Sequence, residues 1–306
     1  MGSPGAESAT TRTMGWTRTI DRRLVHRDAI AEVLLTDLVQ LADRTFEVAA
    51  QWPRSHRVYR PDSAGRHDPM LILETVRQAG LALSHFGFGV DFEQQSVMRD
   101  VGFNLDAAIE PRALTAATNL EIAVRCEDVV RRGNALRSMT VVLDFAVDGA
   151  SFATGTGGIS WVSPRTYQAL RARTTPQLRT AVESARLGGG QPRATRTRSA
   201  ADALIAPSAG SSPHRELVIP LNHPVYFDHP LDHAPGMLLI DAAWQAAAEW
   251  RGTEARLVGA SMQCPAFTEL NQATSIKIEP GPGSSLAFSV EQSGRTTAWG
   301  TFQLAS

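Results

Sequence analysis

The sequence predicts an α+β protein made of two copies of one unit, in which an antiparallel sheet wraps a long buried helix. Shifting the chain by 167 positions places residues 56–79 on residues 223–246 without a gap, and seven of the 24 aligned positions are identical. Each copy contains a helical segment that is apolar on nearly every side, as buried helices are. Each helix is followed by segments of alternating apolar and polar residues, which indicate strands with one buried face.

The first unit is expected to cover residues 21–165, after a disordered N-terminus at residues 1–20. Asp68 is expected to cap its helix, with Pro69 at the first helical position and Gly87 near the end. The elements of this unit follow in the order of a strand at 46–52, the helix at 68–87, and strands at 120–124, 138–145 and 152–161.

The second unit is expected to cover residues 214–306 and to repeat this order. Its elements are a strand at 216–221, the helix at 235–250, and strands at 274–279, 286–291 and 297–304. Residues 166–213 are predicted to be a linker, because the stretch from Gly188 to Pro213 is rich in Gly, Ser, Pro and Arg. A short helix at 167–173 is expected to lead into it.

Composition and charge narrow the classes of function. A length of 306 residues suits two domains, and a net charge of −1 gives no general attraction for nucleic acid. The first residues lack the apolar core of a signal peptide, and no stretch approaches 18 apolar residues. We therefore expect a cytoplasmic protein that binds neither nucleic acid nor membrane. Cys126 and Cys264 form no metal-ligand spacing, and we expect neither a metal nor a cofactor.

A buried helix wrapped by an antiparallel sheet is the arrangement of the hot-dog fold, so the predicted architecture is a tandem double hot-dog. Two such units in one chain would form the side-by-side pair that single hot-dog proteins make by dimerising. The chain would then be a pseudo-dimer, and a homodimer of the whole chain stays open. Active sites in this arrangement lie at the seam between the units.

Three polar residues share one face of the first predicted helix. Glu74, Arg77 and Gln78 stand at positions i, i+3 and i+4 among apolar neighbours. A carboxylate and a guanidinium inside such a helix are costly unless they are paired or used. One interpretation is a structural ion pair between Glu74 and Arg77. The other is a site at the seam, in which Glu74 faces a cleft as a base or as an orienting group.

The second copy keeps part of this pattern. Asp241 and Gln245 occupy the positions of Glu74 and Gln78, whereas Trp244 replaces the arginine. Just before this helix, residues 223–233 contain three histidines and two aspartates, but they lack the helical spacing of a metal site. His223 and His233 are expected to be loop or helix-cap residues. His229 precedes Asp241 by 12 positions. A histidine before a turn, followed by an acid in the buried helix, resembles the bacterial 3-hydroxyacyl-carrier-protein dehydratases, although the spacing here is slightly shorter than theirs.

Several motifs together resemble the A-factor biosynthesis hot-dog repeat family of actinomycetes. They are AEVLLTD (31–37), QWPRSH (51–56), HDPMLILETVRQAG (67–80), ATGTGGISWVSPRTY (153–167) and HPVYFDHPLDHAPGMLLIDAAWQAA (223–247). The resemblance implies transfer of a β-ketoacyl group from acyl carrier protein, or from an acyl-CoA thioester, to the hydroxyl of dihydroxyacetone phosphate. The ester would then cyclise toward a butenolide, the precursor of γ-butyrolactone or furan signalling molecules that trigger antibiotic production.

The resemblance also implies a set of site residues. The family's second unit usually has Glu-Ala-Ala-Arg-Gln where this chain has Asp241-Ala242-Ala243-Trp244-Gln245. We therefore expect a narrowed or more apolar second pocket, with phosphate recognition by Arg77 or another arginine. The helix N-termini near Met70 or Met237 are expected to stabilise the thioester oxygen. The expected catalytic residues are Glu74, His229 and Asp241, and the expected substrate-binding residues are Arg77, Gln78, His56, His223, His233, Trp244 and Gln245.

Two other functions stay open at this point. A hot-dog dehydratase or thioesterase would use His229 and Asp241 and would need no phosphorylated acceptor. A non-catalytic relative that binds an acyl ligand is favoured by the missing arginine at position 244.

Overall fold

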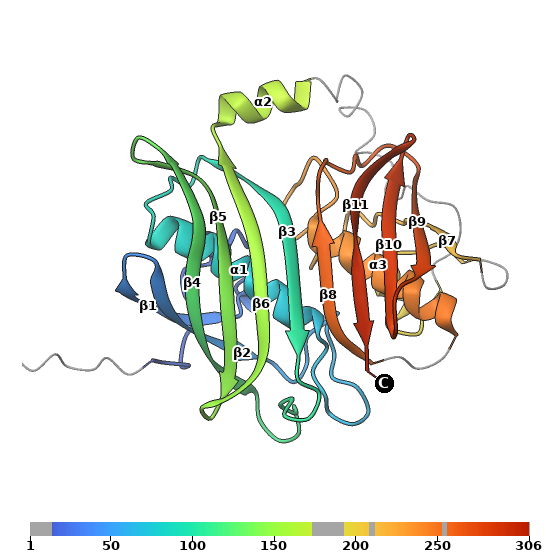
Figure 1. The fold of residues 1–306 in the computed structure, drawn as a ribbon, viewed down its shortest axis with the longest axis horizontal. Coiled ribbons are helices and arrows are strands. Elements are labelled where there is room, and N and C mark those ends of the chain that lie inside the picture. Colours follow the sequence, from blue (N-terminus) through green and yellow to red (C-terminus); the bar gives the residue numbers. More distant parts are fainter. Residues whose placement is uncertain (1–13, 173–192, 208–211, 253–255, 306) are drawn as a thin grey trace, which may run out of the picture.

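Two long helices lie against the same face of one large curled sheet (Figure 1). The computed structural model describes residues 14–172, 193–207, 212–252 and 256–305. Within these residues, eleven strands form one antiparallel sheet in the order β1-β2-β4-β5-β6-β3-β8-β11-β10-β9-β7. No helix of the described part is long and apolar enough to cross a membrane.

The first unit wraps helix α1 (Met70–Phe86), of whose 17 residues 15 are buried. Its strands are β1 (Leu35–Ala42), β2 (Thr45–Trp52), β3 (Gln95–Leu105), β4 (Thr118–Arg132), β5 (Ala135–Val147) and β6 (Ala150–Val162). Short 3₁₀ turns, η1 (Arg22–Val25) and η2 (Ile30–Glu32), lead into β1. Helix α2 (Pro164–Ala172) follows the last strand.

The second unit wraps helix α3 (Gly236–Arg251), of whose 16 residues 12 are buried. Its strands are β7 (His214–Glu216), β8 (Leu257–Gln263), β9 (Thr274–Pro280), β10 (Ser285–Gln292) and β11 (Arg295–Leu304). A 3₁₀ turn, η4 (Ala200–Asp202), precedes β7.

The predicted hot-dog architecture is confirmed, with differences at particular elements. Strands β1, β3 and β8 were not predicted. The strand predicted at 216–221 is wrong beyond its first residue, because β7 ends at Glu216 and Leu217 makes only an isolated bridge to Ile205. The backbone there bonds to two different segments: Leu217 N–H donates to Thr274 O, and Val218 N–H donates to Leu204 O.

The two units join edge to edge through β3 and β8. Residues 100–104 of β3 pair with residues 259–263 of β8, and this pairing makes the sheet continuous. Gly102 sits at this junction, where a Cβ atom would lie 2.9 Å from the Ala260 carbonyl oxygen. Any larger residue would push the strands apart, so the junction depends on glycine here.

Parts of the predicted N-terminal tail and linker make defined contacts. Trp16 Nε1–H donates to the Leu120 carbonyl, and Ile20 N–H donates to the Leu35 carbonyl. In the predicted linker, residues 203–206 are buried. Residues 1–13, most of the Gly-rich part of the linker including Gly188 to Gln191, and Arg173 of the predicted short helix lie outside the described residues.

Candidate active site at the seam

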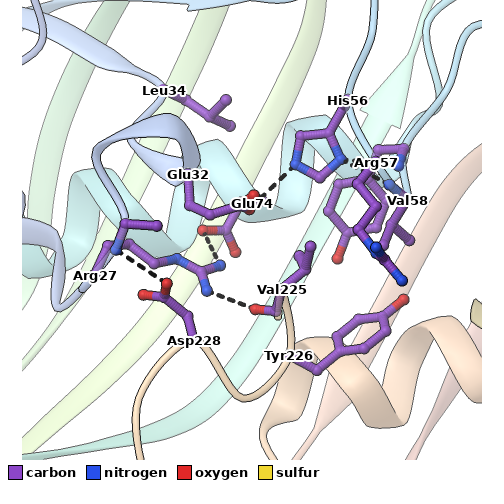
Figure 2. A network of polar contacts seen from close by, with 12 residues as sticks. Arg27, Glu32, Leu34, His56, Arg57, Val58, Glu74, Val225, Tyr226 and Asp228 are labelled. Atoms are coloured by element: carbon purple, nitrogen blue, oxygen red, sulfur yellow. Dashed lines mark hydrogen bonds and ion pairs between the residues drawn. The ribbon is translucent and has the colours of Figure 1, made fainter. Parts of the chain in front are cut away.

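Glu74 lies at the centre of a buried polar network (Figure 2). Its carboxylate accepts hydrogen bonds from Arg27 at 2.7 Å, from Arg77 at 2.8 and 2.9 Å, and from Gln78 at 2.7 Å. Burial alone would raise the pKa of Glu74, but the two guanidinium groups hold it well below its ordinary value. Glu74 is therefore an ionised anchor for two arginines and is poorly suited to accept a proton.

The neighbours of Glu74 tie this network to the backbone. Gln78 accepts a hydrogen bond from Leu34 N–H and donates to the Glu32 carbonyl. His56 Nδ1 accepts from the backbone N–H groups of Val58 and Tyr59, and its Nε2 lies 3.3 Å from the Glu32 carboxylate. Because Nδ1 is an acceptor, the ring proton sits on Nε2, and the histidine is a satisfied structural residue.

The second unit contains an equivalent network around Asp241. Arg198 contacts the Asp241 carboxylate at 2.8 and 2.9 Å, and the Tyr226 hydroxyl also donates to it. Gln245 accepts a hydrogen bond from Leu204 N–H and donates to the Asp202 carbonyl. His223 repeats the role of His56, with Nδ1 accepting from two backbone N–H groups and Nε2 lying 3.2 Å from Asp202.

Arg198 holds Asp241 as Arg27 holds Glu74, and Asp202 faces His223 as Glu32 faces His56. Arg198 therefore corresponds to Arg27, and Asp202 corresponds to Glu32. Arg198 and Asp202 both lie inside the segment that was predicted to be a linker. The repeated unit therefore begins at or before Arg198, well upstream of the boundary predicted at residue 214.

A cavity of about 160 Å³ lies at the seam beside α1. Arg27, Arg77, His26 and His229 line part of it, and they lie close enough for their charges to affect one another. The rest of the lining is mainly apolar, and this lining includes Val76, Leu81, Met98, Val141, Ile159 and Met237. A cationic region next to an apolar one suits a ligand with an anionic head and an acyl chain.

A second cavity of about 780 Å³ occupies the related place beside α3. The expectation of a narrowed or more apolar second pocket is wrong: this cavity is larger than the first, and its lining includes Arg60, Arg66, Arg196, Arg198 and Arg256. Trp244 borders it without filling it, because the indole is 6% exposed and packs edge-on against Phe302, with ring centroids 5.4 Å apart.

The helix N-termini at the two cavities differ. Gly236 and Met237, the first residues of α3, line the first cavity, and no side chain caps this end. At the second cavity, Asp68 accepts a hydrogen bond from Met70 N–H at the start of α1 and pairs with Arg198 at 2.6 Å. A helix N-terminus carries a partial positive charge. The N-terminus of α3, at the first cavity, has no side-chain cap. The N-terminus of α1, at the second cavity, is capped by the Asp68 carboxylate.

Comparison with known proteins agrees with this geometry. The model of the A-factor biosynthesis hotdog domain matches residues 8–163 and 198–304. The chain belongs to the A-factor biosynthesis hot-dog family. The second part of the match begins at Arg198, a residue that the internal symmetry also includes in the second unit.

Two curated members of this A-factor biosynthesis family are each called 2-oxo-3-(phosphooxy)propyl 3-oxoalkanoate synthase. The protein from Streptomyces virginiae is 37% identical over 247 residues, covering 76% of each chain. The protein from Streptomyces coelicolor is 32% identical over 231 residues, covering 73% of this chain and 70% of its own. An acyl-ACP thioesterase structure from Bacteroides thetaiotaomicron shares the fold, with a TM-score of 0.54, 14% identity, and coverage of 85% of this chain and 98% of its own.

The structure divides the site residues predicted for this A-factor family member into three groups. Arg77, His229 and His233 line the first cavity. Trp244 lines the second cavity. The others lie inside the two buried networks and line neither of these cavities: Glu74, Gln78, His56, His223, Asp241 and Gln245.

Two expectations about geometry are therefore corrected. Glu74 does not face the cleft, because it is 2% exposed and its hydrogen-bond donors surround it. The suggested pairing of His229 with Asp241 is also wrong. Asp241 is occupied by Arg198 and Tyr226, whereas His229 Nδ1 lies 4.0 Å from Asp228. Burial is the main cause of the raised pKa of Asp241 and of the lowered pKa of His229.

Several residues of the site were missed by sequence reasoning, chiefly Arg27, Arg198 and His26. A signal for the first two was present. Allowing a shift of three or four residues in the repeat aligns Arg27 and Glu32 with Arg198 and Asp202. No pattern in the sequence points to His26, since its role depends on the fold.

His26 lines the cavity in a left-handed backbone conformation, with φ 51° and ψ 52°. Few residues other than glycine adopt this conformation, and those that do are often at functional sites. Its Nε2 lies 2.9 Å from His85 Nε2, and His85 Nδ1–H donates to the Val90 carbonyl. Burial lowers the pKa of both histidines and so favours neutral rings. In neutral rings His85 Nε2 is the acceptor, and His26 Nε2 carries the proton.

His26 is expected to make the protein sensitive to acid. Burial lowers its pKa from 6.5 to about 3, so the unfolded chain takes up this proton before the folded one does. The free energy of unfolding should therefore fall as the pH drops from 6.5 toward 3. His26→Gln should flatten this fall in urea titrations between about pH 6.5 and pH 4. Exposed His214→Gln is the control, and equal slopes in both variants would contradict the prediction.

Proposed function

We propose that the first cavity catalyses transfer of a 3-oxoacyl group from a thioester to the hydroxyl of dihydroxyacetone phosphate. The observation that carries this proposal is the combination of two arginines, an apolar lining and a helix N-terminus with no side-chain cap in one cavity. The names of the relatives support it. They describe an ester of a 3-oxoalkanoate with a 2-oxo-3-(phosphooxy)propyl group, which is the product of such a transfer.

Arg27 and Arg77 are proposed to bind the acceptor's phosphate. Both line the cavity and are held by Glu74, so their side chains are ordered before substrate arrives. Guanidinium groups suit phosphate because they offer several N–H donors in a planar arrangement. Arg27 Nε is buried and has no hydrogen-bond partner among the described residues, so a phosphate oxygen bound beside it would satisfy this donor. His229, beside these arginines, is proposed to contact the same group.

The start of α3 is proposed to bind the thioester carbonyl. As the acceptor oxygen attacks, the carbonyl oxygen gains negative charge, which backbone N–H groups at a helix N-terminus can stabilise. Gly236 and Met237 occupy this position. The apolar residues along α1, β3 and β6 would then receive the acyl chain. Asp241 has no direct part in this scheme and serves to hold Arg198.

The carrier of the acyl group is proposed to be acyl carrier protein or coenzyme A, in the cytoplasm where such thioesters and triose phosphates occur. No cofactor is required, because acyl transfer neither oxidises nor reduces either substrate. The two units are proposed to act as a pseudo-dimer within one chain, and described residues of both units line the cavity.

A two-substrate assay tests the proposed function. Purified protein is incubated with 3-oxooctanoyl-CoA, with and without dihydroxyacetone phosphate, and the products are identified by mass spectrometry. We expect release of free coenzyme A and formation of the phosphorylated ester only when both substrates are present. Release of free acid without the acceptor would instead indicate a thioesterase. Thioester binding without any turnover would indicate a non-catalytic relative.

Glu74→Gln is expected to keep the fold but to lower turnover by about 100-fold, because small displacements of binding groups are costly in catalysis. The neutral amide no longer balances the buried charges of Arg27 and Arg77, so both guanidinium groups should move. Steady-state kinetics with both substrates and circular dichroism measure the two effects. Exposed Glu47→Gln is the control. A folded, fully active Glu74→Gln protein would reduce Glu74 to a structural residue.

A further inference from the structure

The proposed transfer needs a group that removes the proton from the acceptor hydroxyl. Glu74 and Asp241 are both occupied by arginine and line neither cavity. His26 donates to His85 through Nε2, and burial lowers its pKa to about 3, so it is a weak base. His229 Nδ1 is buried without a hydrogen-bond partner in the described residues, and no carboxylate orients its ring closely.

His233 meets the requirements that the other groups do not. It lines the first cavity, and its side chain is 22% exposed. Its Nδ1 lies 2.7 Å from Asp232 Oδ1. An ionised carboxylate can only accept, so Nδ1 carries the proton and Nε2 bears a free lone pair. No hydrogen-bond partner of Nε2 exists among the residues that the structure describes.

Asp232 is itself held in place by helix α2. The Tyr167 hydroxyl donates to Asp232 Oδ1 at 2.6 Å, and Arg171 Nε–H donates to Oδ2 at 2.9 Å. Burial would raise the pKa of Asp232, but hydrogen bonds from His233 and Tyr167 hold it below its ordinary value. The carboxylate therefore stays ionised, which keeps the proton of His233 on Nδ1.

The position of His233 is also fixed from two other sides. Its backbone pairs with Glu269 in an isolated antiparallel bridge, and its ring packs on Phe267 with centroids 4.7 Å apart. Gly236, at the start of α3, lies only three positions further along the chain and lines the same cavity. His233 is therefore close to the place where the thioester carbonyl is proposed to bind.

The second cavity lacks this arrangement. Arg66 makes the equivalent backbone bridge, to Arg112, and therefore occupies the position of His233 in the first unit. Its side chain pairs with Asp62 at 2.6 Å. An arginine remains protonated in proteins and cannot serve as a base. The pseudo-symmetric fold thus carries an oriented histidine at this position only beside the first cavity.

We propose that His233 is the general base of the acyl transfer and that Asp232 is the residue that positions it. This role rests on the proposed function. His233 Nε2 takes the proton of the acceptor hydroxyl as the oxygen bonds to the thioester carbonyl carbon. The resulting tetrahedral intermediate collapses, the C–S bond breaks, and the imidazolium returns the proton to the leaving thiolate. Atoms and charges balance, with ester and free thiol as products.

His233→Gln and Asp232→Asn test this role, with 3-oxooctanoyl-CoA and dihydroxyacetone phosphate as substrates. His233→Gln should lower kcat by about 10²- to 10⁴-fold, the usual range for a general base, and leave both KM values near wild type. Asp232→Asn should also lower kcat, because the amide can donate a hydrogen bond to His233 Nδ1 and thereby shift the ring proton to Nε2. Exposed His214→Gln is the matched control and should keep wild-type kinetics.

A rescue experiment separates catalysis from structure. His233→Ala should regain activity when free imidazole is added, whereas a protein that has lost only packing should not. Unchanged kcat in His233→Gln would overturn the proposal. A fall in activity that comes from KM alone, or that imidazole fails to rescue, would also overturn it. Wild-type protein that forms no ester would overturn the proposed function itself, and with it this role for His233.

Discussion

Arg77→Met is expected to lower kcat/KM for dihydroxyacetone phosphate by about tenfold to a hundredfold, since a hydrogen bond to a charged group contributes about 1.5–3 kcal/mol. Arg77 lines the first cavity with 18% of its side chain exposed, and Glu74 holds it in place. Methionine keeps much of the side-chain volume and removes the charge. The loss should appear mainly as a higher KM for the acceptor, with little change in the KM for the thioester.

The matched control for this experiment lies in the second cavity. Arg60 lines that cavity, is exposed, and donates only to a backbone carbonyl in the described structure. Arg60→Met should leave transfer unchanged. The opposite outcome, in which Arg60→Met impairs use of the acceptor and Arg77→Met does not, would move the phosphate site to the second cavity.

Arg198→Met is expected to lower the free energy of unfolding by about 3–5 kcal/mol, the usual cost of leaving a buried charge unpaired. The Arg198 side chain is 4% exposed and contacts Asp68 at 2.6 Å and Asp241 at 2.8 Å. Its removal leaves two buried carboxylates without a cation. Urea denaturation at pH 7 measures the change, and exposed Arg196→Met, two positions upstream, should alter stability by no more than about 0.5 kcal/mol.

The pH dependence of Arg198→Met gives an independent check. Burial already raises the pKa of Asp241, and loss of the arginine should raise it further. A carboxyl group with a raised folded-state pKa destabilises the protein at high pH and ceases to do so below its unfolded value, about 3.9. The difference between variant and wild type should therefore shrink as the pH falls from 7 toward 4. A difference that is constant with pH would point to lost packing alone.

The long helices could be predicted because their local sequence is apolar on almost every side, as expected for buried helices. Helix α1 is apolar on almost every side, and α3 repeats it at a fixed offset. Strand β3 lacks such a pattern, since Arg99 and Asp100 interrupt its alternation. This strand joins the two units and borders the cavity. Its residues are therefore determined by contacts with distant segments and not by a local strand pattern.

The candidate site could be predicted only in part, for a related reason. The spacing of Glu74, Arg77 and Gln78 on one helix correctly indicated a polar cluster inside the core. Arg198 gave only a weak signal, because it lies in a polar segment and aligns with Arg27 only when the repeat is shifted by four residues. Its role appears only when residues 43 positions apart, Arg198 and Asp241, are brought together. The 12-residue spacing of His229 and Asp241 likewise could not show that Tyr226 and Arg198 already occupy the Asp241 carboxylate.

The continuous sheet that joins the two units also has an evolutionary consequence. In a dimer of identical chains, each substitution appears at both seams, so neither pocket can change alone. Here one chain encodes the two seams separately and β3 pairs with β8 to hold them together. Trp244 can therefore replace an arginine beside one cavity while Arg77 persists beside the other. Fusion of the units lets duplicated pockets diverge without loss of the shared scaffold.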